Sequence, residues 1–299
     1  MLQNSLPIVI WQGIRPPTLL LGFAPVILGT VLGGYFDSST KVNSLVVILT
    51  LLFVGSLQAA ANLINDAKDA ESGVDSDNRV GPVRVVASGM LPLKQAKIVY
   101  SLLLGLGMTV GLGLAIYGGW TLTIMAAVCC LAAYAYTGGP FPLSHYALGE
   151  ATAFLFFGPV AVLGTAFLHS HRWQYDDLLI SLGPGFLAAA VMAINNVRDM
   201  DTDRQSTKRT LPLLLPDSIS RALPWFFICA GIFVAVIFGL TAEALWYYTV
   251  PSVTLFILAR CFIHPNLIPE GGRMNIALKR CSLFVFLYCC TFALLIGIL

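Results

Sequence analysis

Long apolar stretches recur along the whole of this chain, most of them bounded by polar or charged residues. Nine stretches contain no Asp, Glu, Lys or Arg over a length suited to crossing a hydrocarbon core about 30 Å thick. They are residues 17–35, 43–65, 98–117, 120–137, 151–168, 178–196, 222–240, 244–259 and 281–299. Backbone amides in lipid must be satisfied within their own segment, so each stretch is predicted to be a helix. The predicted fold class is all-α, a polytopic membrane protein of about nine transmembrane helices.

Composition and charge support this class. Hydrophobic residues make up 57% of the chain and charged residues only 11%, against about 25% charged in soluble domains. With the nine helices in place, 15 of the 17 Lys and Arg residues fall on the side of the N-terminus, and only Lys41 and Arg172 fall on the other. This asymmetry predicts an integral protein of a bacterial inner membrane, with the N-terminus and the long loops in the cytoplasm.

Other features exclude functions rather than suggest them. The seven cysteines lie in or beside apolar segments without CxxC spacing, so neither disulfides nor a zinc site is expected. The first apolar segment is too long for a signal-peptide core, and no cleaved leader is expected. The net charge of +2 gives no indication of nucleic-acid binding, because membrane topology explains the basic residues.

Two long polar connections, 66–97 and 197–221, carry the candidate chemistry. Asn62, Asp66 and Asp69 stand at i, i+4 and i+7, on one face of a helix. Asn195, Asp199 and Asp203 repeat the pattern at i, i+4 and i+8. Four predicted helices separate the clusters, and an even number of crossings returns the chain to the same side. Both clusters are therefore predicted to open on one face, as a tandem duplication of four helices would give.

Closely spaced carboxylates repel one another, so a cation is expected between them. Oxygen ligands without a nearby histidine suit Mg²⁺, which is commonly held by carboxylates and substrate phosphates. The basic residues among the acids that are candidates for contacting phosphate directly are Arg79, Arg84, Arg198 and Lys208. A diphosphate site at the mouth of an apolar bundle indicates a lipid diphosphate substrate. Its ionisation would give an allylic cation for a nucleophile to capture, with Asp66, Asp69, Asp199 and Asp203 as catalytic candidates.

Two other interpretations stay open on the residues alone. The clusters are also compatible with solvated loops of balanced charge, and this interpretation is preferred for Glu71, Asp77, Asp201, Lys94 and Lys97. A cation-coupled transporter also uses Asp and Asn within the membrane, although its sites lie near the midplane at broken helices.

The patterns "NxxNDxxD" and "NNxRDxxxDxxxxKRTL" resemble the UbiA-type intramembrane prenyltransferases. Three further stretches are similar to the 1,4-dihydroxy-2-naphthoate prenyltransferases within that family: "RPPTLLLGFAPVILGT" (15–30), "DNRVGPVRVVASG" (77–89) and "YTGGPFPLSHYALGEATAFLFFGPVAVLGT" (136–165). The resemblance covers residues 15 to about 215, and the last three helices match only in hydropathy. One departure, "KRTLPLLLPDS", concerns the loop after Lys208 and not the metal ligands.

The resemblance implies one transmembrane domain over residues 1–299, with nine helices around a central cavity and a cytoplasmic cap. It implies that Asn62, Asp66, Asp69, Asn195, Asp199 and Asp203 hold Mg²⁺ and diphosphate, and Asp75 is a further candidate. It also implies transfer of a polyprenyl group from its diphosphate to 1,4-dihydroxy-2-naphthoate, with loss of CO₂ and diphosphate, in contact with membrane lipid. Sibling enzymes use 4-hydroxybenzoate, homogentisate, a chlorophyllide or haem as the acceptor, and these alternatives stay open.

The candidate acceptor wall is rich in aromatic residues. It comprises Tyr134, Tyr136, His145, Tyr146 and Glu150, with Arg15 as a further contact. Aromatic faces stabilise cations and stack on rings. However, Tyr also forms the interfacial belt of membrane proteins, and a histidine here serves a structural hydrogen bond as readily as proton relay.

Overall fold

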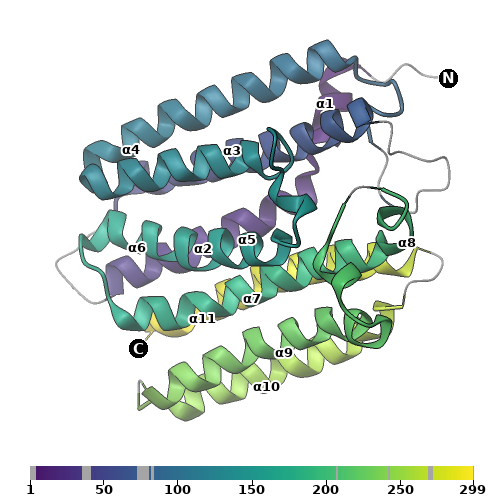
Figure 1. Cartoon of the computed structure of the whole chain (residues 1–299). Helices are drawn as coiled ribbons and strands as arrows, with labels where there is room; N and C mark the ends of the chain where they lie inside the picture. Colours follow the sequence, from purple (N-terminus) through teal and green to yellow (C-terminus); the bar gives the residue numbers. More distant parts are fainter. Residues whose placement is uncertain are drawn as a thin grey trace.

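The computed structural model describes residues 5–35, 42–72, 81, 84–206, 208–241, 243–268 and 272–298. These residues are almost entirely helical, and extended pairing among them is limited to one isolated bridge between Tyr146 and Arg209. The long helices lie side by side in an elongated bundle (Figure 1). The all-α prediction is confirmed.

In chain order the elements are α1 (Leu6–Ile14), α2 (Pro16–Tyr35), α3 (Ser44–Ser72), α4 (Leu93–Ala135), η1 (Leu143–His145), α5 (Gly149–Leu155), the π-helical turn η2 (Phe156–Val160), α6 (Ala161–Ser170), α7 (Tyr175–Arg198), α8 (Met200–Asp203), η3 (Leu211–Leu214), α9 (Asp217–Thr241), α10 (Leu245–Phe262), η4 (His264–Asn266) and α11 (Arg273–Ile298).

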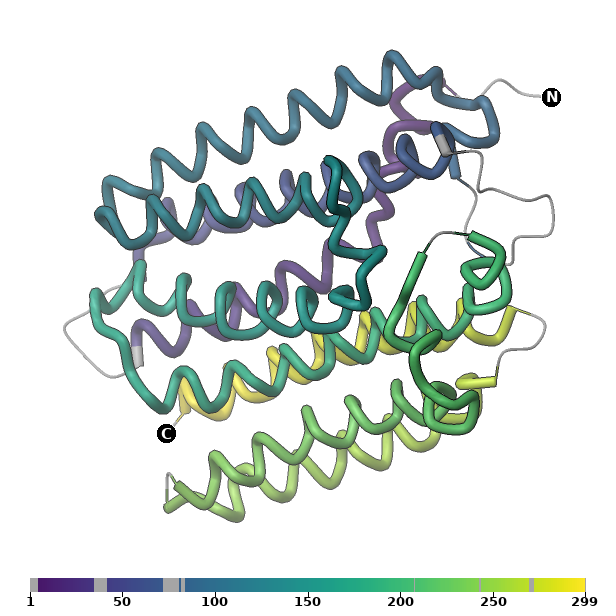
Figure 2. The backbone as a smooth tube through the Cα atoms, viewed as in Figure 1, coloured from purple at the N-terminus to yellow at the C-terminus, as the bar shows by residue number. Residues whose placement is uncertain are grey.

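Eight continuous helical spans in the described residues are long and apolar enough to cross a membrane, and the longest of them contains a break. This span, α4, holds a non-helical residue, Gly119, with φ of 64° and ψ of −161°. Only glycine adopts this conformation readily, and the chain reverses here, so that 93–118 and 120–135 run as two antiparallel helices (Figure 2). The described residues therefore supply two helices where the sequence predicts the segments 98–117 and 120–137, and the break falls between these segments.

Small residues bring the central helices into close contact. A Cβ atom on Gly29 would lie 2.5 Å from the backbone oxygen of Val162, and one on Gly33 would lie 2.5 Å from that of Ala166. Since no hydrophobic force drives helices together within lipid, such close backbone packing is a main source of stability there. Gly158 in η2 meets the backbone of α7 in the same way, so α2, the α5–α6 segment and α7 form a tight central group.

The ends of α3 and α7 lie at the same end of the bundle, as the even number of intervening helices predicts (Figure 1). Two connections meet over this end. Arg209 donates its backbone N–H to the carbonyl of His145 at 3.0 Å, and Ser144 donates its own to the carbonyl of Tyr136 at 2.9 Å. Residues 136–148, 199–206 and 208–216 therefore form a cap over the bundle.

Candidate active site

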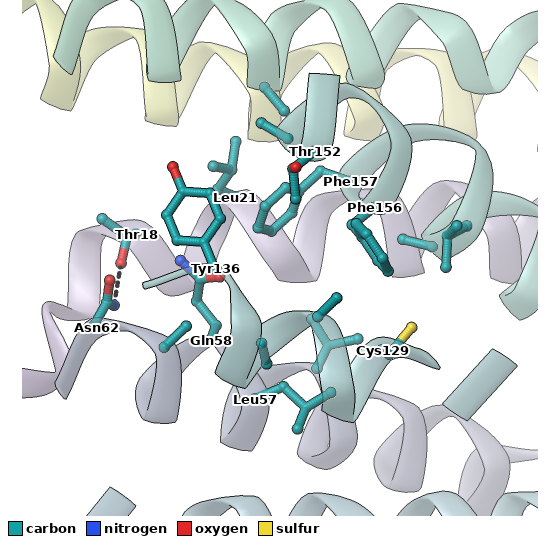
Figure 3. A pocket seen from close by; sticks show the side chains of 18 of the residues that line it. Thr18, Leu21, Leu57, Gln58, Asn62, Cys129, Tyr136, Thr152, Phe156 and Phe157 are labelled. Carbon is teal, nitrogen blue, oxygen red and sulfur yellow. Dashed lines mark hydrogen bonds between the residues drawn. The ribbon is translucent and has the colours of Figure 1, made fainter. Parts of the chain in front are cut away.

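A cavity of about 760 Å³ lies among α2, α3, α4, the α5–α6 segment, α7 and the start of α11. Its wall is mostly apolar and includes Leu21, Leu57 and Phe157 (Figure 3). Polar side chains interrupt this wall at Gln58 and Tyr136. Cavities of this size and lining are typical of sites for small molecules or lipid tails.

A second cavity, of about 40 Å³ and largely polar, adjoins the first under the cap. Both cavities are lined by Arg15, Asn65, Tyr136 and Asn195. The other lining residues of the polar cavity are Arg84, Thr137, Ser144, Asn196, Asp199, Asp203, Lys208 and Thr210. A charged chamber thus opens into an apolar one, which is the arrangement that the sequence predicts for a lipid with an anionic head.

The first acidic motif lies on α3, which continues as a helix beyond the predicted apolar segment 43–65. Asp66 is 1% exposed, and its Oδ2 atom accepts a hydrogen bond from the backbone N–H of Val86 at 3.2 Å. Its Oδ1 atom is buried and has no protein hydrogen-bond donor among the described residues. The turn that contains Val86 therefore fixes the carboxylate through one oxygen, and Asp66 itself is not among the described residues that line the two cavities.

Asp69, one turn further along α3, is 3% exposed and forms an ion pair with Arg84. Its Oδ1 atom lies 3.4 Å from the ammonium nitrogen of Lys208, a residue of the cap. The same nitrogen lies 3.9 Å from Oδ1 of Asp203. Lys208 therefore brings the two acidic motifs together around one charge.

The second motif centres on Arg198, at the end of α7. Its guanidinium donates to both carboxylate oxygens of Asp199, at 2.8 and 2.7 Å. It also donates to the amide oxygens of Asn195, at 2.8 Å, and of Asn275 on α11, at 3.0 Å. The helical face predicted for this motif is interrupted, because Asp199 has φ of −94° and ψ of 5° and separates α7 from α8. Asp203 nevertheless lines the same polar cavity.

The donor set of the polar cavity fits a hard divalent cation in its chemistry. Carboxylate and amide side chains of Asp199, Asp203, Asn195 and Asn196 line it, and the buried Oδ1 atom of Asn65, another lining residue, has no protein hydrogen-bond partner among the described residues. Asp66, whose buried Oδ1 atom also has none, does not line this cavity. Within the described chain, no three carboxylate, histidine or cysteine side chains stand close enough to hold a metal. Arg84, Arg198 and Lys208 form ion pairs with the acids of the two motifs. Asp75, Asp77 and Arg79 lie outside the described residues.

The two amides of the first motif have different surroundings. Asn62 lines the large cavity, and its amide nitrogen donates to the carbonyl of Ile14 at 2.7 Å and to Oγ1 of Thr18 at 2.9 Å (Figure 3). It therefore ties α3 to the corner between α1 and α2. Asn65, which the helical-face argument did not select, lines both cavities. The signal for Asn65 was its i, i+4 spacing to Asp69.

The residues of the candidate acceptor wall separate into two groups. Tyr136 lines both cavities, and its hydroxyl lies 3.0 Å from the sulfur of Met192. A phenol is neutral at pH 7, so the ring of Tyr136 carries no charge. In contrast, Tyr134 and Tyr146 are 41% and 54% exposed, and neither is among the described residues that line the two cavities.

Two other candidates lie behind the wall or under the cap. Glu150 is buried and accepts a hydrogen bond from the amide of Asn196 at 3.0 Å, and Asn196 in turn lines the polar cavity. His145 is half-buried in the cap. Burial lowers its pKa, the charge of Lys208 lowers it further, and Asp69 acts in the opposite direction. Arg15 lines both cavities and acts electrostatically on Asp66.

The charged residues that the sequence analysis assigned to solvated loops, as far as the structure describes them, do not line either cavity. Glu71 forms ion pairs with Lys68 at 2.8 Å and with Lys97 at 2.7 Å, and all three side chains are at least 28% exposed. Asp201 is 94% exposed beside Arg204. Such surface pairs contribute little to stability.

The fold and site together define an integral membrane protein with an apolar cavity and an oxygen-rich, cationic chamber at its head. The chain belongs to the UbiA prenyltransferase family, whose sequence profile matches residues 25–271. It is therefore a membrane-bound prenyltransferase, and the family resemblance drawn from the acidic motifs is confirmed.

Two relatives of known name are similar to this chain over most of its length. The chain is 36% identical over 212 residues to the 1,4-dihydroxy-2-naphthoate octaprenyltransferase of Mycobacterium tuberculosis. The matched region covers 71% of each chain. It is 33% identical over 261 residues to the enzyme of the same name from Escherichia coli, covering 83% of this chain and 80% of the relative.

Solved structures agree with the fold. A UbiA homolog from Archaeoglobus fulgidus, in a structure bound to GPP and Mg²⁺, superposes with a TM-score of 0.69. The match covers 97% of this chain and all of that one at 14% identity. At this identity the comparison establishes the common architecture.

Proposed function

We propose that this protein transfers a polyprenyl group from its diphosphate to 1,4-dihydroxy-2-naphthoate, releasing diphosphate and CO₂. Five relatives at 31–36% identity carry the name of that octaprenyltransferase activity and support the acceptor. The observation that carries the proposal is the meeting of the two acidic motifs at Lys208, where a charged chamber opens into an apolar cavity.

The metal proposed for this site is Mg²⁺, held by oxygens of Asp66, Asp69, Asp199 and Asp203 with help from Asn195. When bound together with the diphosphate, it would neutralise the charge that builds on the leaving group. The unpartnered Oδ1 atom of Asp66 and the oxygen-rich lining of the polar cavity support this set. The choice of metal is also supported by a protein of the same fold, because the Archaeoglobus fulgidus homolog has a structure bound to GPP and Mg²⁺. The amide of Asn62 is proposed to orient the corner of α1 and α2 beside this head group.

Arg84, Arg198 and Lys208 are proposed to contact the phosphate oxygens directly, together with Arg79. Each of the first three lies in or beside the polar cavity and is now paired with an acid. A bound metal would take over part of the acids' charge and leave these cations available to the diphosphate. Their positive charge then stabilises the leaving group more than it stabilises the intact donor, which lowers the barrier to ionisation.

The apolar cavity is proposed to hold the isoprenoid chain and to keep water from the allylic cation. Its wall places the ring of Tyr136 next to the polar cavity. A neutral phenol ring presents a negative π face to a cation without reacting with it. The electron-rich diol of the acceptor supplies the nucleophilic carbon, so the protein chiefly positions the two substrates and excludes water from them.

The Lys and Arg asymmetry supports an orientation with the N-terminus and the polar cap in the cytoplasm. In that orientation the diphosphate head and the water-soluble acceptor approach from the cytoplasm, and the donor tail comes from the bilayer. Fusion of a reporter to residue 5 and to residue 172, on opposite predicted sides, tests this placement.

Mass spectrometry of the product is the decisive experiment. Purified protein in lipid vesicles is given dihydroxynaphthoate, Mg²⁺ and a mixture of polyprenyl diphosphates. The expected product is the prenylated, decarboxylated naphthalene diol, with diphosphate released in equal amount and no product in the presence of a chelator. A product only with 4-hydroxybenzoate, homogentisate, a chlorophyllide or haem would establish a sibling activity. Uptake of a solute into sealed vesicles, with no diphosphate release, would establish transport instead.

A further inference from the structure

The large cavity has an unusual distribution of charge for a site of this size. No Asp, Glu or His is among the described residues that line it, whereas three cations are: Arg15, Arg198 and Lys279. An apolar, low-dielectric wall strengthens the field of each uncompensated charge. The cavity itself is therefore suited to an anion, in addition to the diphosphate in the polar chamber.

Arg198 and Arg15 already have acidic partners. Arg198 makes two hydrogen bonds with Asp199, and Arg15 acts on Asp66. Lys279 differs, because no carboxylate of the described residues forms an ion pair with it. Its side chain is exposed and also lines the cavity, so it lies where the cavity meets the surface.

Two contacts of α11 indicate the position of Lys279 along the axis of the bundle. Asn275, which accepts a hydrogen bond from Arg198, precedes Lys279 by four residues on α11, so both lie on one face about one helical turn apart. A Cβ on Gly297 would lie 3.7 Å from Val31, which sets α11 in register with α2. α2 and α11 begin at the same end of the bundle (Figure 1), so Lys279, about two turns into α11, lies toward the end at which α2 begins, and Arg15, which precedes α2, lines the same cavity. Lys279 thus lies one turn from the residues that surround the diphosphate head, on the apolar side.

We propose that Lys279 binds the carboxylate of the aromatic acceptor and so selects acceptors that are acids. This inference rests on the proposed function and adds the residue that recognises the second substrate. Lys279 is absent from the described lining of the polar cavity, so its effect is on the acceptor and not on the diphosphate. The ammonium at the mouth would attract a small planar anion, and the ion pair would hold its ring beside Tyr136.

The test compares two acceptors in vesicles of neutral phosphatidylcholine under anaerobic conditions. One is dihydroxynaphthoate, and the other is 1,4-dihydroxynaphthalene, which lacks the carboxylate and gives up a proton instead of CO₂ on prenylation. Lys279→Gln is expected to raise KM for the acid about tenfold, with KM for the carboxylate-free diol and for the donor unchanged. Lys279→Arg is expected to retain most of the affinity for the acid, because it retains the charge.

A binding measurement without donor gives an independent readout, and dihydroxynaphthoate fluorescence is expected to show the same weakening in Lys279→Gln. Arg273→Gln is the matched control, because Arg273 is an exposed cation of the same helix and does not line the cavity. An equal effect of Lys279→Gln on both acceptors, or one that arises only when anionic phospholipid is added, would assign Lys279 to a lipid head group and overturn the inference. An unchanged KM for the acid would also overturn it. Failure of the wild-type protein with every acceptor would instead refute the proposed function.

Discussion

Asp69 and Asp203 lie on either side of one ammonium group, at 3.4 and 3.9 Å from the Nζ atom of Lys208, although one belongs to α3 and the other to α8. Both carboxylates are buried. Two buried acids facing one lysine are held by a balance of repulsion and pairing that a divalent cation would shift. Substitution of either carboxylate should therefore change the activity of the site strongly.

Asp203→Asn is expected to lower the rate of product formation by about 100-fold or more, because it removes one anionic oxygen ligand and alters the charge around Lys208. Product formed by membranes of equal protein content, measured by chromatography, checks this. The matched control is Asp201→Asn, two residues earlier on α8, where the side chain is 94% exposed. Activity within about twofold of wild type is expected for this control. Equal activity of the two variants would remove Asp203 from the site.

The close contact between α2 and α6 at Gly29 predicts how a substitution there changes stability. Gly29→Ala would place a Cβ 2.5 Å from the backbone oxygen of Val162, so α2 and α6 must separate. The expected loss of unfolding free energy is about 1–3 kcal/mol, as for other overpacked sites. Thermal unfolding in detergent measures it. Gly113→Ala is the control, because a Cβ there meets no atom within 4 Å, and the alanine is expected to be neutral or slightly stabilising. An unchanged unfolding temperature for Gly29→Ala would contradict the packing.

The sequence predicted the helices well because lipid imposes a strong rule on them. A charge-free run long enough to cross the membrane must be helical, and the break at Gly119 falls between two of the predicted segments. It could not place the end of α3, which runs on to Ser72 through polar residues. There the helix is supported by local pairs such as Lys68 with Glu71, and hydropathy carries no signal of them.

The candidate site was predicted less completely. Helical spacing identified Asp66 and Asp69 as members of one face, since that relation is local in the chain. It did not identify Asn275 or Lys279, because their importance arises only when α11 packs beside α7 and α2 (Figure 1). It also could not separate Tyr136, which faces the two cavities from the end of α4, from Tyr134, which is 41% exposed. Such relations depend on tertiary packing.

The environment of His145 predicts a dependence of stability on pH. Its folded-state pKa is lowered by burial and by Lys208, so the unfolded chain takes up the proton first as the pH falls. The contribution of His145 to stability is therefore complete above the unfolded value of about 6.5 and is lost as the pH falls through the folded value. The drop in unfolding temperature between about pH 7.5 and about pH 5.5 is expected to be smaller in His145→Gln than in wild type. His171→Gln removes an exposed imidazole and is the control. An equal drop in His145→Gln and wild type would show that the folded-state pKa of His145 is not lowered.

The ring of Tyr136 is expected to matter more than its hydroxyl. The hydroxyl lies against the sulfur of Met192, a weak acceptor, whereas the ring lines both cavities at the position proposed for the allylic cation. Tyr136→Phe is therefore expected to keep most of the activity, and Tyr136→Leu to lose about tenfold in kcat, the size of a desolvated cation–π contact. Steady-state kinetics with both substrates separates kcat from KM. Tyr134→Leu, at a 41% exposed position of the same helix, is expected to have little effect. If Tyr136→Phe proved as inactive as Tyr136→Leu, the hydroxyl would have a role in proton transfer or hydrogen bonding that the π face does not explain.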